Sequence, residues 1–176
     1  VGFALKKEDN AEFICDCSDL SEIIVIHKDG KYVVTKVTEK AFFGKDILYV
    51  GLFDRNDQRT IYNVIYREGK TSVSYAKRFA VTSVTRDKEY DITQGTPGSK
   101  ILWFTVNHNG EAETVKIYLR PRPKLKKLID EYDFSQLLIK GRASRGNLVS
   151  KNPIQKITLK SKRVSTIGGK DIWFDE

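Results

Sequence analysis

The stretch IIVIHKDGKYVVTKV, residues 23–37, decides the fold. Its two halves are rich in β-branched and aromatic residues, which favour strands. They flank the turn Lys28-Asp29-Gly30-Lys31. Asp-Gly between two such runs is the strongest local signal of a β-hairpin, because the tight turn needs a positive φ angle. We therefore predict an antiparallel hairpin at this point of the chain.

The same pattern recurs twice further along the chain. YNVIYREGKTSVSY at 62–75 and ILWFTVNHNGEAETVKIYL at 101–119 also place a glycine turn between two strand-like runs. The turn glycines are Gly30, Gly69 and Gly110, so the period is about 40 residues. Such a period predicts repeated β units that bury their apolar faces against one another, as in a propeller or solenoid. Equally spaced hairpins in an ordinary antiparallel protein are the alternative.

A fourth, diverged unit is predicted from residues 154–159 through 168–174. The fold class is therefore all-β, with about four repeated units in one domain that spans residues 1–176. The predicted units are 20–58, 59–97, 98–138 and 139–176.

The segment 120–138 departs from the hairpin rhythm. Arg120-Pro121-Arg122-Pro123 is extended by its prolines. Residues 124–138 then place apolar side chains at a helical spacing, so a short helix and a strand are both open. We favour a strand, because the surroundings are β and its basic residues suit an edge strand. The segment is expected to connect the third and fourth units.

Positive charge is concentrated in one part of the sequence. The 176 residues carry a formal net charge of +8, which excludes a strongly acidic protein and favours nucleic acid or an anionic membrane as partner. Thirteen of the 31 Lys and Arg residues, but three of the 23 Asp and Glu residues, lie within 120–163, leaving the remainder slightly acidic. A solvated surface normally mixes both signs. The segregation therefore predicts a patch that binds a polyanion.

The centre of this patch is IKGRASRGNL, residues 139–148. Its two glycines and three cations predict a flexible loop that brings backbone N–H groups and guanidinium groups close to phosphates. The spacing of a triphosphate-binding loop is absent, and a plain solvated hairpin is the alternative. The predicted contacts are Lys140, Arg142, Arg145, Lys151, Lys156, Arg120, Arg122, Lys124, Lys126 and Lys127.

No catalytic or metal-binding constellation stands out. Cys15 and Cys17 lack the partners for a four-ligand zinc site, even with His27 and His108, so we expect two reduced thiols in a cytoplasmic protein. The sequence has neither an apolar run of ~18 residues for a membrane span nor a signal peptide. Because it lacks methionine, we expect a piece of a longer chain.

Together the units, turns and basic loop resemble the C-terminal domain of the A subunits of type IIA topoisomerases, which are DNA gyrase and topoisomerase IV. YAKRFAVT, VTRDKEY, IKGR and VSTIGGK carry the resemblance, at residues 75–82, 84–90, 139–142 and 164–170. The resemblance implies a β-pinwheel, a propeller-like disc of four-stranded blades that exchange strands. About four blades fit this chain where the family usually has five or six, so either the disc is incomplete or the sequence stops early.

The resemblance also implies a function. DNA wraps around or bends along the basic rim, and the domain presents duplex DNA to an ATP-dependent strand-passage core. The piece itself is expected to have no catalytic residue, metal or cofactor, since the parent enzyme cleaves with another domain and binds ATP and Mg²⁺ through its B subunit. The expected partners are double-stranded DNA, the B subunit, and the rest of the A subunit, with no membrane, in the bacterial cytoplasm at the nucleoid.

Two details follow from the same resemblance. Lys77 and Arg78 are expected to be further DNA contacts, because the family is basic at this position of the repeat unit. Gyrase subunits carry the loop Gln-Arg-Arg-Gly-Gly-Lys-Gly, and KGRASRG at 140–146 keeps its basic and glycine residues without its order. That departure favours a function like that of topoisomerase IV.

Other classes of function stay open at this point. A propeller-like module that docks proteins would need exposed aromatic anchors, for which Tyr49, Phe53, Trp103 and Trp173 are candidates. A β-rich hydrolase lacks a nucleophile and base in a recognisable pattern. Binding to a membrane surface would need a basic amphipathic helix, and residues 124–138 are the only candidate.

Overall fold

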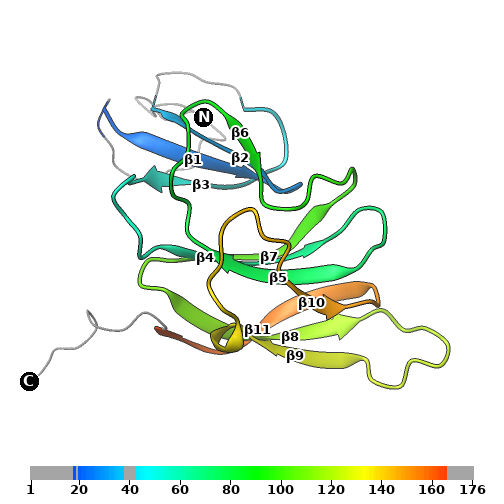
Figure 1. The fold of residues 1–176 in the computed structure, drawn as a ribbon. Helices are drawn as coiled ribbons and strands as arrows, with labels where there is room; N and C mark the ends of the chain where they lie inside the picture. The colour runs from blue at the N-terminus through cyan, green and yellow to red at the C-terminus, as the bar shows by residue number, and fades with distance from the viewer. Residues whose placement is uncertain (1–17, 19, 38–42, 166–176) are drawn as a thin grey trace, which may run out of the picture.

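The structure, a computed structural model, is all-β (Figure 1). It describes residues 18, 20–37 and 43–165. One 3₁₀ turn, η1, at Phe134–Gln136 interrupts the strands of this part of the chain. The strands are β1 Glu22–His27, β2 Lys31–Lys36, β3 Ile47–Phe53, β4 Ile61–Arg67, β5 Ser74–Phe79, β6 Glu89–Asp91, β7 Lys100–Asn107, β8 Glu111–Leu119, β9 Ile129–Asp133, β10 Asn147–Ser150 and β11 Ile154–Ser165.

The described strands form three antiparallel sheets, in the orders β3-β1-β2-β6, β10-β5-β4-β7 and β11-β8-β9. We call them the first, second and third sheets. Figure 1 shows them stacked one after another. Each sheet is centred on a hairpin, β1–β2, β4–β5 or β8–β9. The ends of all three hairpins lie toward the right of the view.

Neighbouring sheets exchange strands. The first sheet receives β6 from the chain that follows the β4–β5 hairpin. The second sheet receives β10 in the same way, after the β8–β9 hairpin. No described strand pairs with the outer edge of β9, so the third sheet has three strands and the array is open. This is the arrangement of an incomplete β-pinwheel, as predicted.

The hairpins predicted around Gly30 and Gly69 are confirmed by the pairing of β1 with β2 and of β4 with β5. The hairpin predicted around Gly110 is wrong. Its two strands, β7 and β8, lie in different sheets, because β7 pairs with β4 and β8 pairs with β9 and β11. The turn at Gly110, with φ of 64°, therefore carries the chain from the second sheet to the third.

The segment 120–138 forms the loop and the second strand of the third hairpin, so it does not connect two units. Residues 129–133 form β9, which confirms the strand, and Phe134–Gln136 add the one 3₁₀ turn. The predicted fourth unit begins with β10 and β11, which complete the second and third sheets. Its residues 168–174 lie outside the described part of the chain.

Two hydrophobic cores hold the sheets together, and β4 serves both. Val64 belongs to a core between the first and second sheets, where Ile24, Val34 and Phe79 also lie. Ile65 points to a second core with Val115 and others of the third sheet. Because successive strand residues face opposite sides, a middle sheet needs apolar residues on both. This is why IYNVIY, residues 61–66, is buried throughout.

Candidate nucleic-acid interface

The loop between β8 and β9 projects from the end of the third sheet. A hydrogen bond from Leu119 N to Leu128 O, 2.8 Å long, closes the hairpin and leaves residues 120–127 outside it. Pro121 and Pro123 cannot donate to a sheet, so this segment stays free of strand pairing. Its five cations, which are all exposed, are Arg120, Arg122, Lys124, Lys126 and Lys127.

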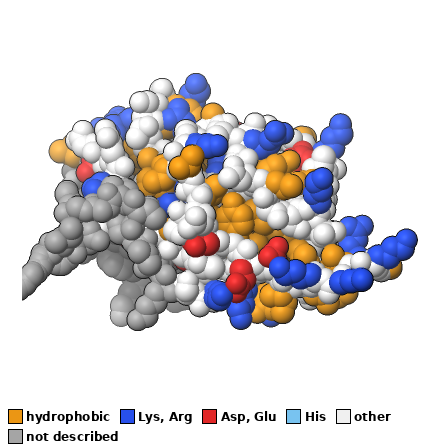
Figure 2. Space-filling model, turned by 60° about the horizontal axis from the view of Figure 1, so that its bottom comes forward, with side chains coloured by type: hydrophobic (Ala, Val, Ile, Leu, Met, Phe, Trp, Pro, Cys, Tyr) orange, Lys and Arg blue, Asp and Glu red, His pale blue; other side chains and the backbone are white. Residues whose placement is uncertain are grey.

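Figure 2 shows Lys and Arg side chains covering this projecting loop, at the right of the view. The nearest counter-charge is Asp130, whose carboxylate lies 3.3 Å from the Lys127 ammonium. That pair is exposed on both sides and contributes little to stability. The other four cations form no ion pair within the described residues, so the loop presents an uncompensated positive charge.

Two further predicted contacts, Lys151 in the turn before β11 and Lys156 on β11, belong to the chain that lies beside this loop. Arg120 N donates to Pro153 O over 3.0 Å, which brings the chain around Lys151 to the base of the loop. Lys156 is exposed on β11, and its ammonium lies 4.6 Å from the centre of the Tyr118 ring. Both side chains therefore extend the positive charge of the β8–β9 loop onto the third sheet.

The predicted flexible loop, residues 140–146, is held in place at several points. Lys140 N donates to Arg78 O at 3.0 Å, and the Tyr66 hydroxyl donates to Arg145 O at 2.6 Å. Gly146, with φ of 94°, packs against the backbone of Ala76. Lys140 and Arg145 remain exposed, with the Arg145 guanidinium near the ring of Tyr75. The loop therefore offers two cations on a fixed support.

Arg142 faces inward instead. Its guanidinium lies 4.7 Å from the centre of the Tyr90 ring and donates to the backbone carbonyls of Thr82 and Ser83. The residue is half-buried. Its charge thus joins the loop to β6 and to the chain after β5, and its donors are not turned to solvent as the sequence-based interpretation assumed.

Lys77 and Arg78 are buried, with exposed fractions of 2% and 1%. The Lys77 ammonium donates to Arg142 O and Ser144 O, at 2.6 and 2.8 Å. Burial lowers the pKa of Lys77 to about 8, and the raising effect of Asp91 does not offset it. These contacts make Lys77 a support for the loop. Its burial is at odds with the expected direct contact to DNA.

Arg78 ties the second sheet to the third. Its guanidinium donates to Asn63 Oδ1 and Gly110 O, both at 2.9 Å. Asn63 in turn donates to the buried carboxylate of Glu113 at 2.6 Å. Burial lowers the pKa of Arg78, while Glu113 opposes that shift. Buried charges need such partners, so a structural role explains Arg78 and a surface contact does not.

The structure therefore splits the predicted contact residues. Those of the β8–β9 loop, with Lys151 and Lys156, lie at the end of the third sheet or on its β11, and Lys140 and Arg145 lie on the fixed loop. Arg142, Lys77 and Arg78 are interior supports. Sequence reasoning missed four cations that meet at the ends of the first two sheets, because they are separated in the sequence and mixed with acidic residues. They are Lys28, Lys45, Arg67 and Lys100.

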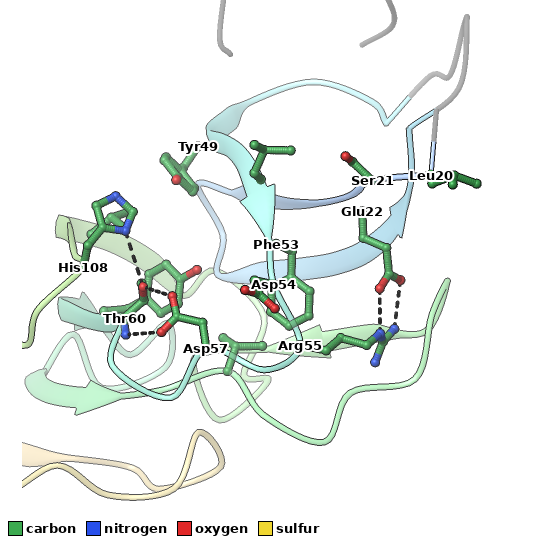
Figure 3. A pocket seen from close by; sticks show the side chains of 14 residues that line it. Leu20, Ser21, Glu22, Tyr49, Phe53, Asp54, Arg55, Asp57, Thr60 and His108 are labelled. Carbon is green, nitrogen blue, oxygen red and sulfur yellow. Dashed lines mark hydrogen bonds and ion pairs between the residues drawn. The ribbon is translucent and has the colours of Figure 1, made fainter. Parts of the chain in front are cut away.

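A different cavity, of about 540 Å³, lies between the end of β3 and the start of β4 (Figure 3). Tyr49 and Phe53, two of the proposed aromatic anchors, line it. Its carboxylate at Glu22 is bound by Arg55 at 2.6 and 2.9 Å and by Arg86 at 3.0 Å. The two Arg55 hydrogen bonds and the one from Arg86 lower the pKa of Glu22 against the opposing effect of burial.

The cavity also holds the side chains of Asp57, Thr60 and His108, but their contacts are those of a turn. Asp57 accepts from Arg59 N at 2.8 Å, from Thr60 N at 3.1 Å and from the Thr60 hydroxyl. Burial acts to raise the pKa of Asp57, and these hydrogen bonds outweigh it, so the pKa is lowered. The Thr60 hydroxyl donates to Asp57, but the lowered pKa of Asp57 makes this carboxylate a weak base, so it would activate the hydroxyl poorly as a nucleophile.

Two further observations limit the kinds of site. Among residues 18, 20–37 and 43–165, no three His, Cys, Asp or Glu side chains come together as they would around a metal ion. No helix in the same part of the chain is long and apolar enough to cross a membrane. Trp103, a further proposed anchor, is partly buried and donates to Glu113 at 3.1 Å, and Trp173 lies outside the described residues.

Comparisons with known proteins agree with this architecture. The family model described as the topoisomerase C-terminal domain of Bacteroidota matches residues 1–162. The A subunit of DNA topoisomerase 4 from Borreliella burgdorferi is 24% identical over 160 residues, which are 90% of this chain and 24% of that protein. The chain thus spans about a quarter of its relative's length. The chain belongs to the topoisomerase C-terminal domain family, the C-terminal domain of type IIA topoisomerase A subunits.

Proposed function

We propose that this chain binds and bends duplex DNA for a bacterial type IIA topoisomerase, without catalysing a reaction itself. The observation that carries the proposal is the β8–β9 loop, where four exposed cations have no ion-pair partner among the described residues. The family supplies the context, since topoisomerases act on DNA. Lys151, Lys156, Lys140 and Arg145 extend the positive surface beyond the loop.

The proposed mechanism is electrostatic. Lys and Arg side chains replace counterions along the phosphate backbone, which makes binding strong at low salt and largely independent of sequence. A rigid support matters, because bending ~20–30 base pairs costs on the order of several kcal/mol and contacts along the bend must offset it. The strand exchange between sheets and the buried Arg78 network provide that rigidity.

The parent enzyme is proposed to be an ATP-dependent topoisomerase that resembles topoisomerase IV more than gyrase. Residues 140–146 lack the gyrase order, and Arg142 within them faces inward to Tyr90. ATP and Mg²⁺ are proposed to bind the partner B subunit. The proposed protein partners, in the bacterial cytoplasm, are this B subunit together with the remainder of the A subunit.

The test is direct binding and bending of DNA by this chain. We expect it to bind a random-sequence duplex of 30 base pairs, with binding measured by fluorescence anisotropy. We also expect it to bend a longer duplex, so that energy transfer between dyes at its two ends increases. Binding that is absent at low salt would contradict the proposal. Docking of proteins at the Tyr49–Phe53 cavity is the second candidate, and it predicts no change in DNA affinity from cations on the β8–β9 loop.

A further inference from the structure

We infer that the Tyr49–Phe53 cavity binds an extended segment of a protein partner, in which apolar side chains stand next to a Lys or Arg. The cavity, of about 540 Å³, lies at the end of β3 and the start of β4, which are the strand ends away from the hairpin turns (Figure 3). Such binding is a function additional to DNA binding and independent of it, because a different surface carries it.

The cavity offers apolar surface to a ligand. Tyr62 and Val81, which line it, are buried, and Phe53 is partly buried. Leu20 and Leu52 also line it, and their exposed fractions are 76% and 48%. A partner that covers these side chains removes apolar surface from water, which stabilises the complex. Exposed apolar side chains grouped around a cavity therefore favour a protein contact.

The outer edge of β3 can accept a further strand. β3 lies at the end of the first sheet, and no described strand pairs with its outer edge. Its sequence, ILYVGLF at 47–53, includes neither a charged residue nor a proline. Edge strands usually carry charges or prolines that prevent further pairing, and β7 and β11, at the edges of the other two sheets, both contain lysine. β3 lacks this protection, so an extended peptide can pair with its backbone.

The cavity carries an excess of negative charge. Three carboxylates line it, at Glu22, Asp54 and Asp57. Glu22 is paired with Arg55, whereas Asp54 and Asp57 form no ion pair among the residues that the structure describes. The lowered pKa of Asp57 keeps its carboxylate charged at neutral pH. Such a surface repels DNA phosphates and attracts a Lys or Arg side chain.

The apolar lining, the strand edge and the negative charge together select the occupant. A small molecule does not use a strand edge, and the carboxylates repel DNA. An extended peptide uses all three, because its backbone pairs with β3, its alternate side chains enter the cavity, and a cation beside them reaches Asp54. Figure 3 shows Phe53 and Asp54 near the centre of the cavity, so neighbouring side chains of one peptide reach both.

The test uses the unmodified chain and a fluorescein-labelled peptide, SLSFKLK, with binding measured by fluorescence anisotropy. The apolar side chains of this peptide alternate along an extended backbone, and two lysines flank the last of them. We expect saturable binding that weakens as salt is raised. SLSFELE, with glutamate in place of both lysines, should bind roughly tenfold more weakly. Hydrogen exchange of the β3 amides should slow when SLSFKLK is bound, since the added strand pairs with the outer edge.

Two pairs of matched variants locate the peptide. Asp54→Asn and Asp29→Asn each remove an exposed carboxylate that accepts from the backbone N–H two residues later, at 2.9 and 3.0 Å. Leu52→Thr and Leu159→Thr each remove a leucine that is about half exposed. Asp54→Asn should weaken binding of SLSFKLK roughly two- to fivefold, and Leu52→Thr roughly three- to tenfold. Asp29→Asn, at a hairpin turn, and Leu159→Thr, in the third sheet, should leave it unchanged.

Four outcomes would overturn this binding site. The unmodified chain shows no saturable binding of SLSFKLK, or Asp54→Asn and Leu52→Thr bind it as tightly as their controls, or β3 exchanges equally fast with and without it. The fourth is a fall in DNA affinity confined to Asp54→Asn and Leu52→Thr, which would show that DNA occupies the cavity. We expect all four variants to keep the DNA affinity of the unmodified chain, and thermal unfolding checks the fold of each.

Discussion

The buried ammonium of Lys77 donates a hydrogen bond to the backbone carbonyl of Arg142, 2.6 Å away, across 65 residues of sequence. Arg142 then places its own guanidinium on the Tyr90 ring of β6. Lys77 thus binds the loop to the second sheet, and Arg142 binds the same loop to the first sheet. The basic residues Lys77 and Arg142, which the sequence suggested as DNA contacts, therefore hold this loop in place.

The first prediction concerns the pH dependence of stability. The pKa of Lys77 is lowered to about 8 by burial, against ~10.4 in an unfolded chain. Between these values the unfolded chain binds the proton and the folded chain does not, so stability attributable to Lys77 rises with pH. The free energy of unfolding of the unmodified chain, relative to Lys77→Met, should increase by about 2 kcal/mol from pH 7 to pH 9.5.

Urea unfolding of both proteins at the two pH values measures this difference. Lys36→Met, a change at an exposed lysine, is the control and should show no such increase. If the free energy of unfolding of the unmodified chain stays constant or falls relative to that of Lys77→Met as the pH rises, the pKa of Lys77 is not lowered in the folded chain.

The second prediction separates two arginines of one loop. Arg142→Ala removes donors to two backbone carbonyls and the contact with Tyr90, so it should lower the free energy of unfolding by about 1–3 kcal/mol. Arg145→Ala removes an exposed cation, so it should change stability little and weaken DNA binding. Urea unfolding and fluorescence anisotropy with DNA are measured for both variants. If the two variants lose the same stability and the same DNA affinity, the distinction between a structural Arg142 and a DNA-binding Arg145 is wrong.

The third prediction concerns Arg78. Arg78→Met leaves the carbonyl of Gly110 and the amide oxygen of Asn63 without this donor and removes the cation near Glu113. Loss of a buried charge that other groups depend on costs about 3 kcal/mol or more. DNA affinity, measured where the variant is still folded, should not change. A fall in affinity with unchanged stability would restore Arg78 as a DNA contact.

The fourth prediction uses two glycines with opposite surroundings. A Cβ at Gly69 would meet Pro97 O, Gly98 C and Ser99 N within 2.7 Å, while a Cβ at Gly141 would meet nothing within 4 Å. Gly69→Ala must displace the backbone of residues 97–99, at a cost of about 1–3 kcal/mol. Gly141→Ala should be close to neutral. Thermal unfolding of the pair tests this; similar melting temperatures would contradict the close approach.

Local signals in the sequence account for much of the fold. Asp29-Gly30 and Glu68-Gly69 lie at true hairpins, and the β-branched runs around them are strands. Asn109-Gly110 has the same turn chemistry, yet the strands beside it join different sheets. A turn fixes how the chain reverses locally. Which strand then pairs is set by the sheet–sheet packing and by strand exchange, which are non-local.

The candidate site likewise has a part that local sequence predicts and a part that depends on non-local contacts. Exposure of Arg120–Lys127 follows from two prolines and a run of cations, which local sequence shows. Burial of Lys77 and Arg78 depends on carbonyls at residues 110, 142 and 144 and on Asn63, and nothing near Lys77 in the sequence indicates them. The grouping of Lys28, Lys45, Arg67 and Lys100 could not be predicted for the same reason, since these cations come from separate segments of the chain.

The central claim is that the β8–β9 loop binds DNA phosphates, and the salt dependence of binding tests it most directly. Affinity for a 30-base-pair duplex is measured at several salt concentrations for the unmodified chain and for Arg122→Ala with Lys124→Ala and Lys126→Ala. Each lost phosphate contact removes about 0.9 from the slope, so we predict a slope lower by two to three, roughly, with unchanged thermal stability. An unchanged slope in a folded variant would contradict the account.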